Sequence, residues 1–96
     1  MIEVSVRKNG VTVTGHAGNG LPGQDIVCAA VSILTENLIQ SVESLTEDKI
    51  KYGISPGRAD IKFGNLSEKS KTLVDSFFVG ICMIADGYPE NIQIVC

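Results

Sequence analysis

The sequence is poor in the residues that small proteins use for cross-links and metal sites. It contains no tryptophan, one histidine and three cysteines, Cys28, Cys82 and Cys96. The cysteines are odd in number and form no C-x-x-C pair, so neither a disulfide framework nor a zinc site is indicated. We therefore expect no metal, no organic cofactor and a reducing, cytoplasmic compartment.

An excess of basic residues is also missing. The formal net charge is −3, with 8 Lys and Arg residues against 11 Asp and Glu residues, which argues against a generic nucleic-acid binder. The N-terminus lacks the basic and apolar regions of a signal peptide, and no apolar run approaches the length of a membrane span. We expect no direct nucleic-acid partner, no membrane and a single domain over residues 1–96.

Two stretches have the periodicity of helices. From Asp25 to about Leu45, apolar residues recur every three or four positions, which is the spacing of one helical face. A second helix is predicted to begin after the N-cap residue Ser67 and to end at Gly87, its C′ residue. Its apolar face is so broad that we expect it to be largely buried, with Cys82 in the core.

Alternation of apolar and polar residues predicts the strands. Asn9-Gly10 is the preferred pair for a type I′ hairpin turn between the first two strands, and Ser55–Arg58 is a turn by composition. Arg58 is either a solvated surface residue, which we favour, or a contact for a substrate carboxylate. The strands are predicted at residues 2–7, 11–14, 49–54, 59–63 and 92–96.

The predicted order is strand, strand, helix, strand, strand, helix, strand. This order indicates an α+β fold, with two helices packed on one face of a mostly antiparallel five-stranded sheet. The other face of the sheet would then be exposed or would meet a second subunit. Because the chain is small, we expect a homodimer.

The stretch from His16 to Cys28 carries the reactive side chains. With Asp25 as N-cap, Cys28 falls at N3, where the positive end of the helix dipole lowers the pKa of a thiol. A histidine within reach would complete an activated nucleophile and its base, and the N–H of Cys28 would be one oxyanion donor. The alternative is a small buried hydrophobe, since Val27 and Ala29 flank the cysteine.

The exact order of residues in this stretch identifies a family more specifically than its composition does. Gly-His-Ala at residues 15–17 and Asp-Ile-Val-Cys-Ala-Ala-Val-Ser at residues 25–32, with eleven residues between the His and the Cys, resemble the Prp family of ribosomal-processing cysteine proteases. The short first hairpin, the long helix and the chain length are also similar to that family. The resemblance implies that Cys28 is the nucleophile and His16 the general base and acid.

The resemblance also implies a substrate class. Such cysteine endopeptidases remove a short N-terminal extension from a bacterial large-subunit ribosomal protein, and apolar and aromatic side chains precede the cleaved bond. The resemblance further supports a homodimer. Two rival functions use the same scaffold: a non-catalytic ribosome-associated interaction module, and a redox-sensing thiol protein in which Cys28 oxidises reversibly.

Two features around the pair have alternative roles. Asp25 either caps the helix, which its position favours, or orients the imidazole of His16 as the carboxylate of a triad does. The segment between the pair is either a plain connection or a flexible loop that gates the substrate. In the second case Gly18, Gly20 and Gly23 would supply the backbone freedom.

Overall fold

The computed structural model describes residues 1–15 and 24–96, and of Gln24 and Asp25 it describes the backbone. The order of the elements is the predicted one. The helices and strands are β1 (Ile2–Arg7), β2 (Gly10–Thr14), α1 (Gln24–Leu45), β3 (Lys51–Ser55), β4 (Arg58–Lys62), α2 (Glu68–Gly87) and β5 (Ile92–Val95).

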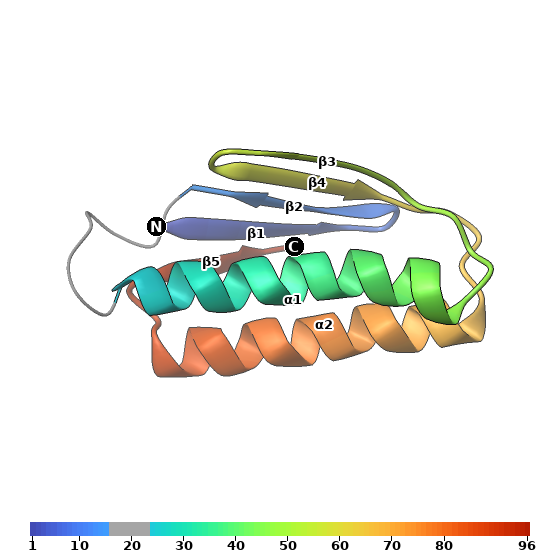
Figure 1. Cartoon of the computed structure of the whole chain (residues 1–96). Coiled ribbons are helices and arrows are strands. Elements are labelled where there is room, and N and C mark those ends of the chain that lie inside the picture. The colour runs from blue at the N-terminus through green and yellow to red at the C-terminus, as the bar shows by residue number, and fades with distance from the viewer. Residues whose placement is uncertain (16–23) are drawn as a thin grey trace.

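The five strands form one sheet in the order β3-β4-β2-β1-β5. All neighbouring strands are antiparallel except β1 and β5, which are parallel. The two helices lie side by side on the same side of the sheet and run in opposite directions (Figure 1). The predicted α+β architecture is therefore confirmed.

The core lies between the helices and one face of the sheet. Register places Val4 opposite Val13, and Val11 opposite Ile61, so the inward positions of neighbouring strands form one apolar layer. The helices cover this layer, and burial of their apolar side chains is the main force that holds them on the sheet. The buried members of the core are Ile2, Val4, Val11, Val27, Val31, Leu38, Ile39, Val42, Ile61, Phe77, Ile81 and Ile92.

The first hairpin turn differs from the prediction. Arg7 pairs with Gly10, so Lys8 and Asn9 are the central residues, and neither has the positive φ that a type I′ turn requires. Gly10 instead begins β2. A Cβ there would lie 2.5 Å from the carbonyl oxygen of Ile61, so the close approach of β4 requires this glycine.

The second hairpin turn is where the composition places it. Pro56 and Gly57 connect β3 to β4, and Gly57 has φ +74°. Proline followed by a glycine of positive φ is the pattern of a type II turn. This tight turn projects from the sheet beside α1 and forms part of the site described below.

The helix ends agree with the sequence in part. Ser67 is the N-cap of α2, as predicted, and its side chain accepts from the N–H of Ser70. Gly87 is not a C′ residue, because it is still helical and Tyr88 is the C-cap. The helix ends there because Pro89 disfavours helical backbone at the residue before it.

Helix α2 is less deeply buried than its composition predicts. Of its broad apolar face only Phe77 and Ile81 are buried large side chains, and Cys82 is exposed, so its assignment to the core is wrong. Successive helical residues are about 100° apart around the axis. Cys82 is thereby turned out of the interface that Ile81 occupies.

Helix α1 begins at Gln24, one residue before the predicted start, and it is long and apolar enough over Ile26–Leu45 to span a membrane by length and composition. The expectation that no stretch approaches that length is therefore wrong by this criterion. Core helices of globular proteins meet the same criterion. Here Val31 and Val42 are buried against the sheet.

Candidate active site

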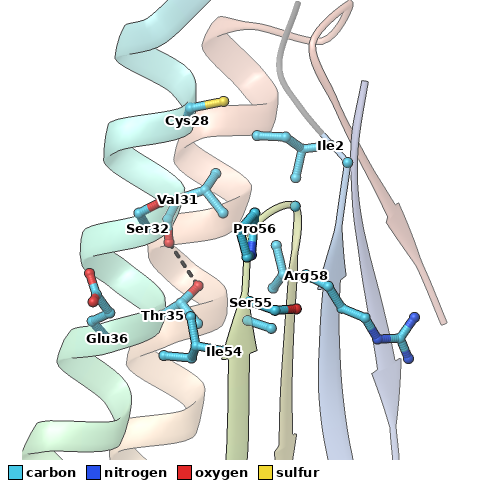
Figure 2. A pocket seen from close by; sticks show the side chains of 14 residues that line it. Ile2, Cys28, Val31, Ser32, Thr35, Glu36, Ile54, Ser55, Pro56 and Arg58 are labelled. Carbon is cyan, nitrogen blue, oxygen red and sulfur yellow. Dashed lines mark hydrogen bonds between the residues drawn. The ribbon is translucent and has the colours of Figure 1, made fainter.

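A groove of about 310 Å³ lies between α1 and the turn that connects β3 to β4 (Figure 2). Its walls combine one face of α1, the end of the sheet and the tip of the β3–β4 hairpin. The lining residues are Ile2, Val13, Gly15, Cys28, Val31, Ser32, Thr35, Glu36, Ile54, Ser55, Pro56, Gly57, Arg58 and Ala59.

Cys28 lies at one end of this groove. Its side chain is half-buried and packs against the core, and Figure 2 shows its sulfur pointing from α1 toward the sheet, on the side of Ile2. This position fits both interpretations of the sequence, a reactive nucleophile and a small buried hydrophobe. The thiol is supported by apolar neighbours and still opens onto a groove.

The start of α1 changes the register of Cys28. Because the helix begins at Gln24, Cys28 is its fifth residue and not N3. In a regular helix the N–H of the fifth residue points to the carbonyl of the first, which disfavours the N–H of Cys28 as an oxyanion donor. The dipole effect on the thiol is also weaker than at N3, since it falls off beyond the first turn.

Gly15 fixes the end of the sheet at this groove. Its N–H donates to the carbonyl of Gly57 at 2.9 Å, and its φ is +92°. A Cβ at this position would lie 2.3 Å from the carbonyl oxygen of Met1. Glycine is therefore required at the residue that precedes His16 in the sequence.

The walls of the groove are largely apolar. Pro56 on the hairpin lies across from Val31 on α1, and Ile54 lies beside Thr35 (Figure 2). Beneath them the buried hydroxyl of Thr35 donates to the carbonyl of Val31 at 2.7 Å and so needs no other partner. Such a surface suits apolar side chains of a ligand.

Arg58 lines the groove but is held by its own strand. Its Nε donates to Oδ2 of Asp60 at 2.8 Å and its Nη2 to Oδ1 at 3.2 Å. These contacts raise the pKa of Arg58, and together with the hydroxyl of Thr12 they lower the pKa of Asp60. The pairing supports a surface arginine more than a free contact for a substrate carboxylate.

The remaining predicted site residues lie outside the described part of the chain. They are His16, Gly18, Gly20 and Gly23, together with the side chain of Asp25. The backbone of Asp25 is described and forms the second residue of α1, so the prediction that Asp25 is the N-cap is wrong. The other roles predicted for these residues, including orientation of the imidazole by Asp25, stay predictions. Among the described residues, no group of three His, Cys, Asp or Glu side chains is arranged to hold a metal ion.

The far wall of the groove is not predicted by the sequence. Alternation places Ile54 on the buried face of a strand, whereas β3 is an edge strand and Ile54 is 54% exposed. The Pro-Gly pair that follows this strand does predict a hairpin turn. What the sequence does not show is that this hairpin extends beside α1.

Comparisons with known proteins agree with this arrangement. The family model described as cysteine protease Prp matches residues 1–93. The ribosomal processing cysteine protease Prp of Staphylococcus aureus is 26% identical over 100 residues, covering 97% of this chain and 94% of that protein.

Two crystal structures have the same fold. SMU.848 from Streptococcus mutans is 33% identical with a TM-score of 0.82, and the match covers 98% of this chain and 90% of that chain. The S. aureus protease Prp in complex with a covalently linked product peptide is 23% identical with a TM-score of 0.84, covering 98% and 95% of the two chains.

Proposed function

Because the chain belongs to the cysteine protease Prp family, we propose that Cys28 is its nucleophile and that His16 is the general base and acid. The observation that carries this assignment is the position of the three thiols. Cys28 lines the groove, whereas Cys82 and Cys96 are exposed and are not among its lining residues. Gly15, which directly precedes His16 in the sequence, lines the same groove.

The proposed reaction has two steps. His16 takes the proton of the Cys28 thiol, the thiolate attacks the scissile carbonyl, and the amine leaves with the proton that His16 returns. A thioester then links Cys28 to the N-terminal fragment. Water, deprotonated by His16, hydrolyses it and regenerates the thiol.

We propose the groove between α1 and the β3–β4 hairpin as the place where the peptide binds. Its apolar wall complements apolar and aromatic side chains before the cleaved bond. Strand β3 is an edge of the sheet and all of its residues are exposed, so its outward backbone groups can pair with an extended peptide. The peptide would then lie between β3 and α1, with its scissile bond near Cys28.

The proposed substrate is the N-terminal extension of a bacterial large-subunit ribosomal protein. The name of the S. aureus relative, a ribosomal processing protease, supports this class. The odd number of cysteines and the lack of a C-x-x-C pair support the cytoplasm as the location, because thiols stay reduced there.

The proposed assembly is a homodimer formed through the helices. On the side away from the sheet, α1 and α2 expose four large apolar side chains, namely Ile26 at 58%, Ile33 at 63%, Val79 at 62% and Met83 at 69%. Ile26 and Ile33 are two turns apart, and Val79 and Met83 one turn, so each pair lies along one side of its helix. Exposed apolar side chains that lie together on one side of the molecule support the proposed interface.

The test is cleavage of a peptide copied from the N-terminus of the host's extended ribosomal protein, with the products located by mass spectrometry. The wild type and Cys82→Ala should cleave at one bond, and Cys28→Ala and His16→Ala should not. Equal cleavage by Cys28→Ala would refute the assignment. A folded wild type that cleaves no such peptide would favour the non-catalytic interaction module.

A further inference from the structure

The face of the sheet that the helices leave open is polar and carries a row of cations. Across four neighbouring strands the register aligns Lys51 with Lys62, Lys62 with Gly10, and Gly10 with Arg7. Side chains aligned in this way lie on one face. The sequence neighbours Ile61 and Val11 are buried on the opposite, helix-covered side of the same strands.

Two features of this row are unfavourable for an isolated protein. Lys51 lies directly opposite Lys62, and like charges in that position destabilise a sheet. Three strand spacings separate the ends of the row, so it concentrates three cations within about 14 Å. A bound anion would relieve this repulsion.

Asp60, two residues before Lys62 on β4, relieves it only in part, since of the three cations only Arg7 helps to lower the pKa of this carboxyl. Both oxygens of Asp60 accept from Arg58, and one of them also accepts from Thr12 at 2.9 Å. Arg7 donates to the same hydroxyl of Thr12 at 2.6 Å. Among the described residues, neither Lys51 nor Lys62 forms an ion pair.

The cations surround a hollow of about 600 Å³ on this face. Gly10 lies in the row of cations and Gly53 lies beside it. Neither has a side chain that would fill the surface there. Besides Arg7, Lys51, Arg58 and Lys62, the residues that line the hollow are Gly53, Asp60 and Tyr52.

The charges of the molecule are segregated. The five strands contain four basic and two acidic residues, whereas the two helices contain two basic and six acidic residues. The net charge of −3 therefore conceals a positive sheet and a negative helix layer. The expectation of no nucleic-acid partner rests on the net charge of the whole chain, which does not show how the charges are distributed.

We propose that the open face of the sheet, centred on Lys51, Lys62 and Arg7, binds the phosphate backbone of RNA. The face lacks the large apolar anchors that form the core of a protein interface or enter a membrane. What it offers is a compact set of cations, which is sufficient for sequence-independent contact with phosphates. The choice of RNA over DNA rests on the proposed function, since a ribosomal substrate is surrounded by RNA.

The test is fluorescence anisotropy with a labelled single-stranded RNA oligonucleotide over a range of KCl concentrations. The double variant Lys51→Gln/Lys62→Gln should bind at least about tenfold more weakly than the wild type at low salt. The slope of log K against log salt should also fall by about 1.4, at roughly 0.7 for each phosphate that is no longer neutralised. The matched control Lys69→Gln/Lys71→Gln removes two cations from α2 and should bind as the wild type does.

Two results would overturn the proposal: equally weakened binding in both double variants, or no binding by the wild type at low salt. Tighter binding to phosphatidylserine vesicles or to polyglutamate than to RNA would also overturn it, because it would assign the face to a different partner.

Peptide cleavage is measured in parallel, and Lys51→Gln/Lys62→Gln should retain it. A wild type that binds RNA but cleaves no ribosomal peptide would contradict the proposed function alone. A wild type that cleaves but binds no RNA would contradict this inference alone. Circular dichroism of each variant checks that the fold is retained.

Discussion

The N–H of Gly15 donates to the carbonyl of Gly57 across 2.9 Å and ties the end of β2 to the β3–β4 turn. This hydrogen bond joins the residue that precedes His16 to the wall of the groove that faces Cys28. The end of β2 is therefore held at the groove by the backbone of a glycine.

Replacement of Gly15 by alanine should destabilise the fold and lower activity. Its φ of +92° is unfavourable for alanine, and the new Cβ would lie 2.3 Å from the carbonyl oxygen of Met1. We expect a loss of about 2 kcal/mol or more in the free energy of unfolding, measured by urea denaturation. The control Gly53→Ala meets no atom within 4 Å and should change stability by less than about 1 kcal/mol.

Replacement of Ile54 by alanine should weaken binding of the peptide more than the chemical step. Ile54 forms part of the groove wall and is 54% exposed, so its replacement should leave stability nearly unchanged. We expect KM to rise about threefold to tenfold with kcat within about twofold, because uniform binding is what the substitution removes. Tyr52→Ala, on the same strand but outside the groove, should leave KM unchanged, and equal effects of both variants would argue against the groove.

The connection between α1 and β3 should make stability sensitive to acid. Asp48 accepts from the hydroxyl of Ser67, from the hydroxyl of Ser70 and from the N–H of Ser67 at 2.9 Å. These bonds lower the pKa of Asp48 below its usual 3.8. A lowered pKa in the folded state contributes stability that is present above the unfolded pKa and is lost as pH falls through the folded pKa.

The measurement is the melting temperature of the wild type and of Asp48→Asn from neutral pH to strongly acidic pH. The wild type should be the more stable at neutral pH, and the difference should shrink as pH falls below 3.8. A difference that stays constant over this range would show that the charge of Asp48 contributes nothing. Glu47→Gln, at an adjacent residue in the sequence, is the control.

The proposed homodimer should dissociate when charge enters the outer surface of the helices. The double variant Ile33→Asp/Met83→Asp places two carboxylates among exposed apolar side chains, and we expect a monomer by sedimentation velocity. The control Gln93→Asp/Val95→Asp adds the same charge to β5 on the open face of the sheet. A monomer in the control and a dimer in the helix variant would place the interface on the open face instead.

The sequence predicts the elements that depend on local chemistry. The Ser67 cap and the Pro56-Gly57 turn follow from side-chain and backbone preferences of a few neighbouring residues, and both are confirmed. The predicted type I′ turn is wrong because Gly10 is required by the carbonyl of Ile61, on a strand far away in the sequence. Local preference carries no information about such a contact.

The candidate site divides in the same way. The motif and the nearby helix start single out Cys28, and this residue does line a groove. The wall opposite to it is not predicted, because periodicity shows that Ile54 is apolar but not that β3 is an edge strand. The core assignment of Cys82 is wrong for the related reason that periodicity does not fix how far a helix overlaps its sheet.

The most direct measurement compares the rates at which iodoacetamide alkylates the three cysteines near neutral pH, by peptide mapping with mass spectrometry. Cys28 is half-buried, whereas Cys82 and Cys96 are exposed, so access alone would make Cys28 the slowest. If Cys28 is the activated nucleophile, it should react first, and His16→Ala should remove that advantage. Faster labelling of Cys82 and Cys96, with Cys28 equally slow in the wild type and in His16→Ala, would contradict the assignment.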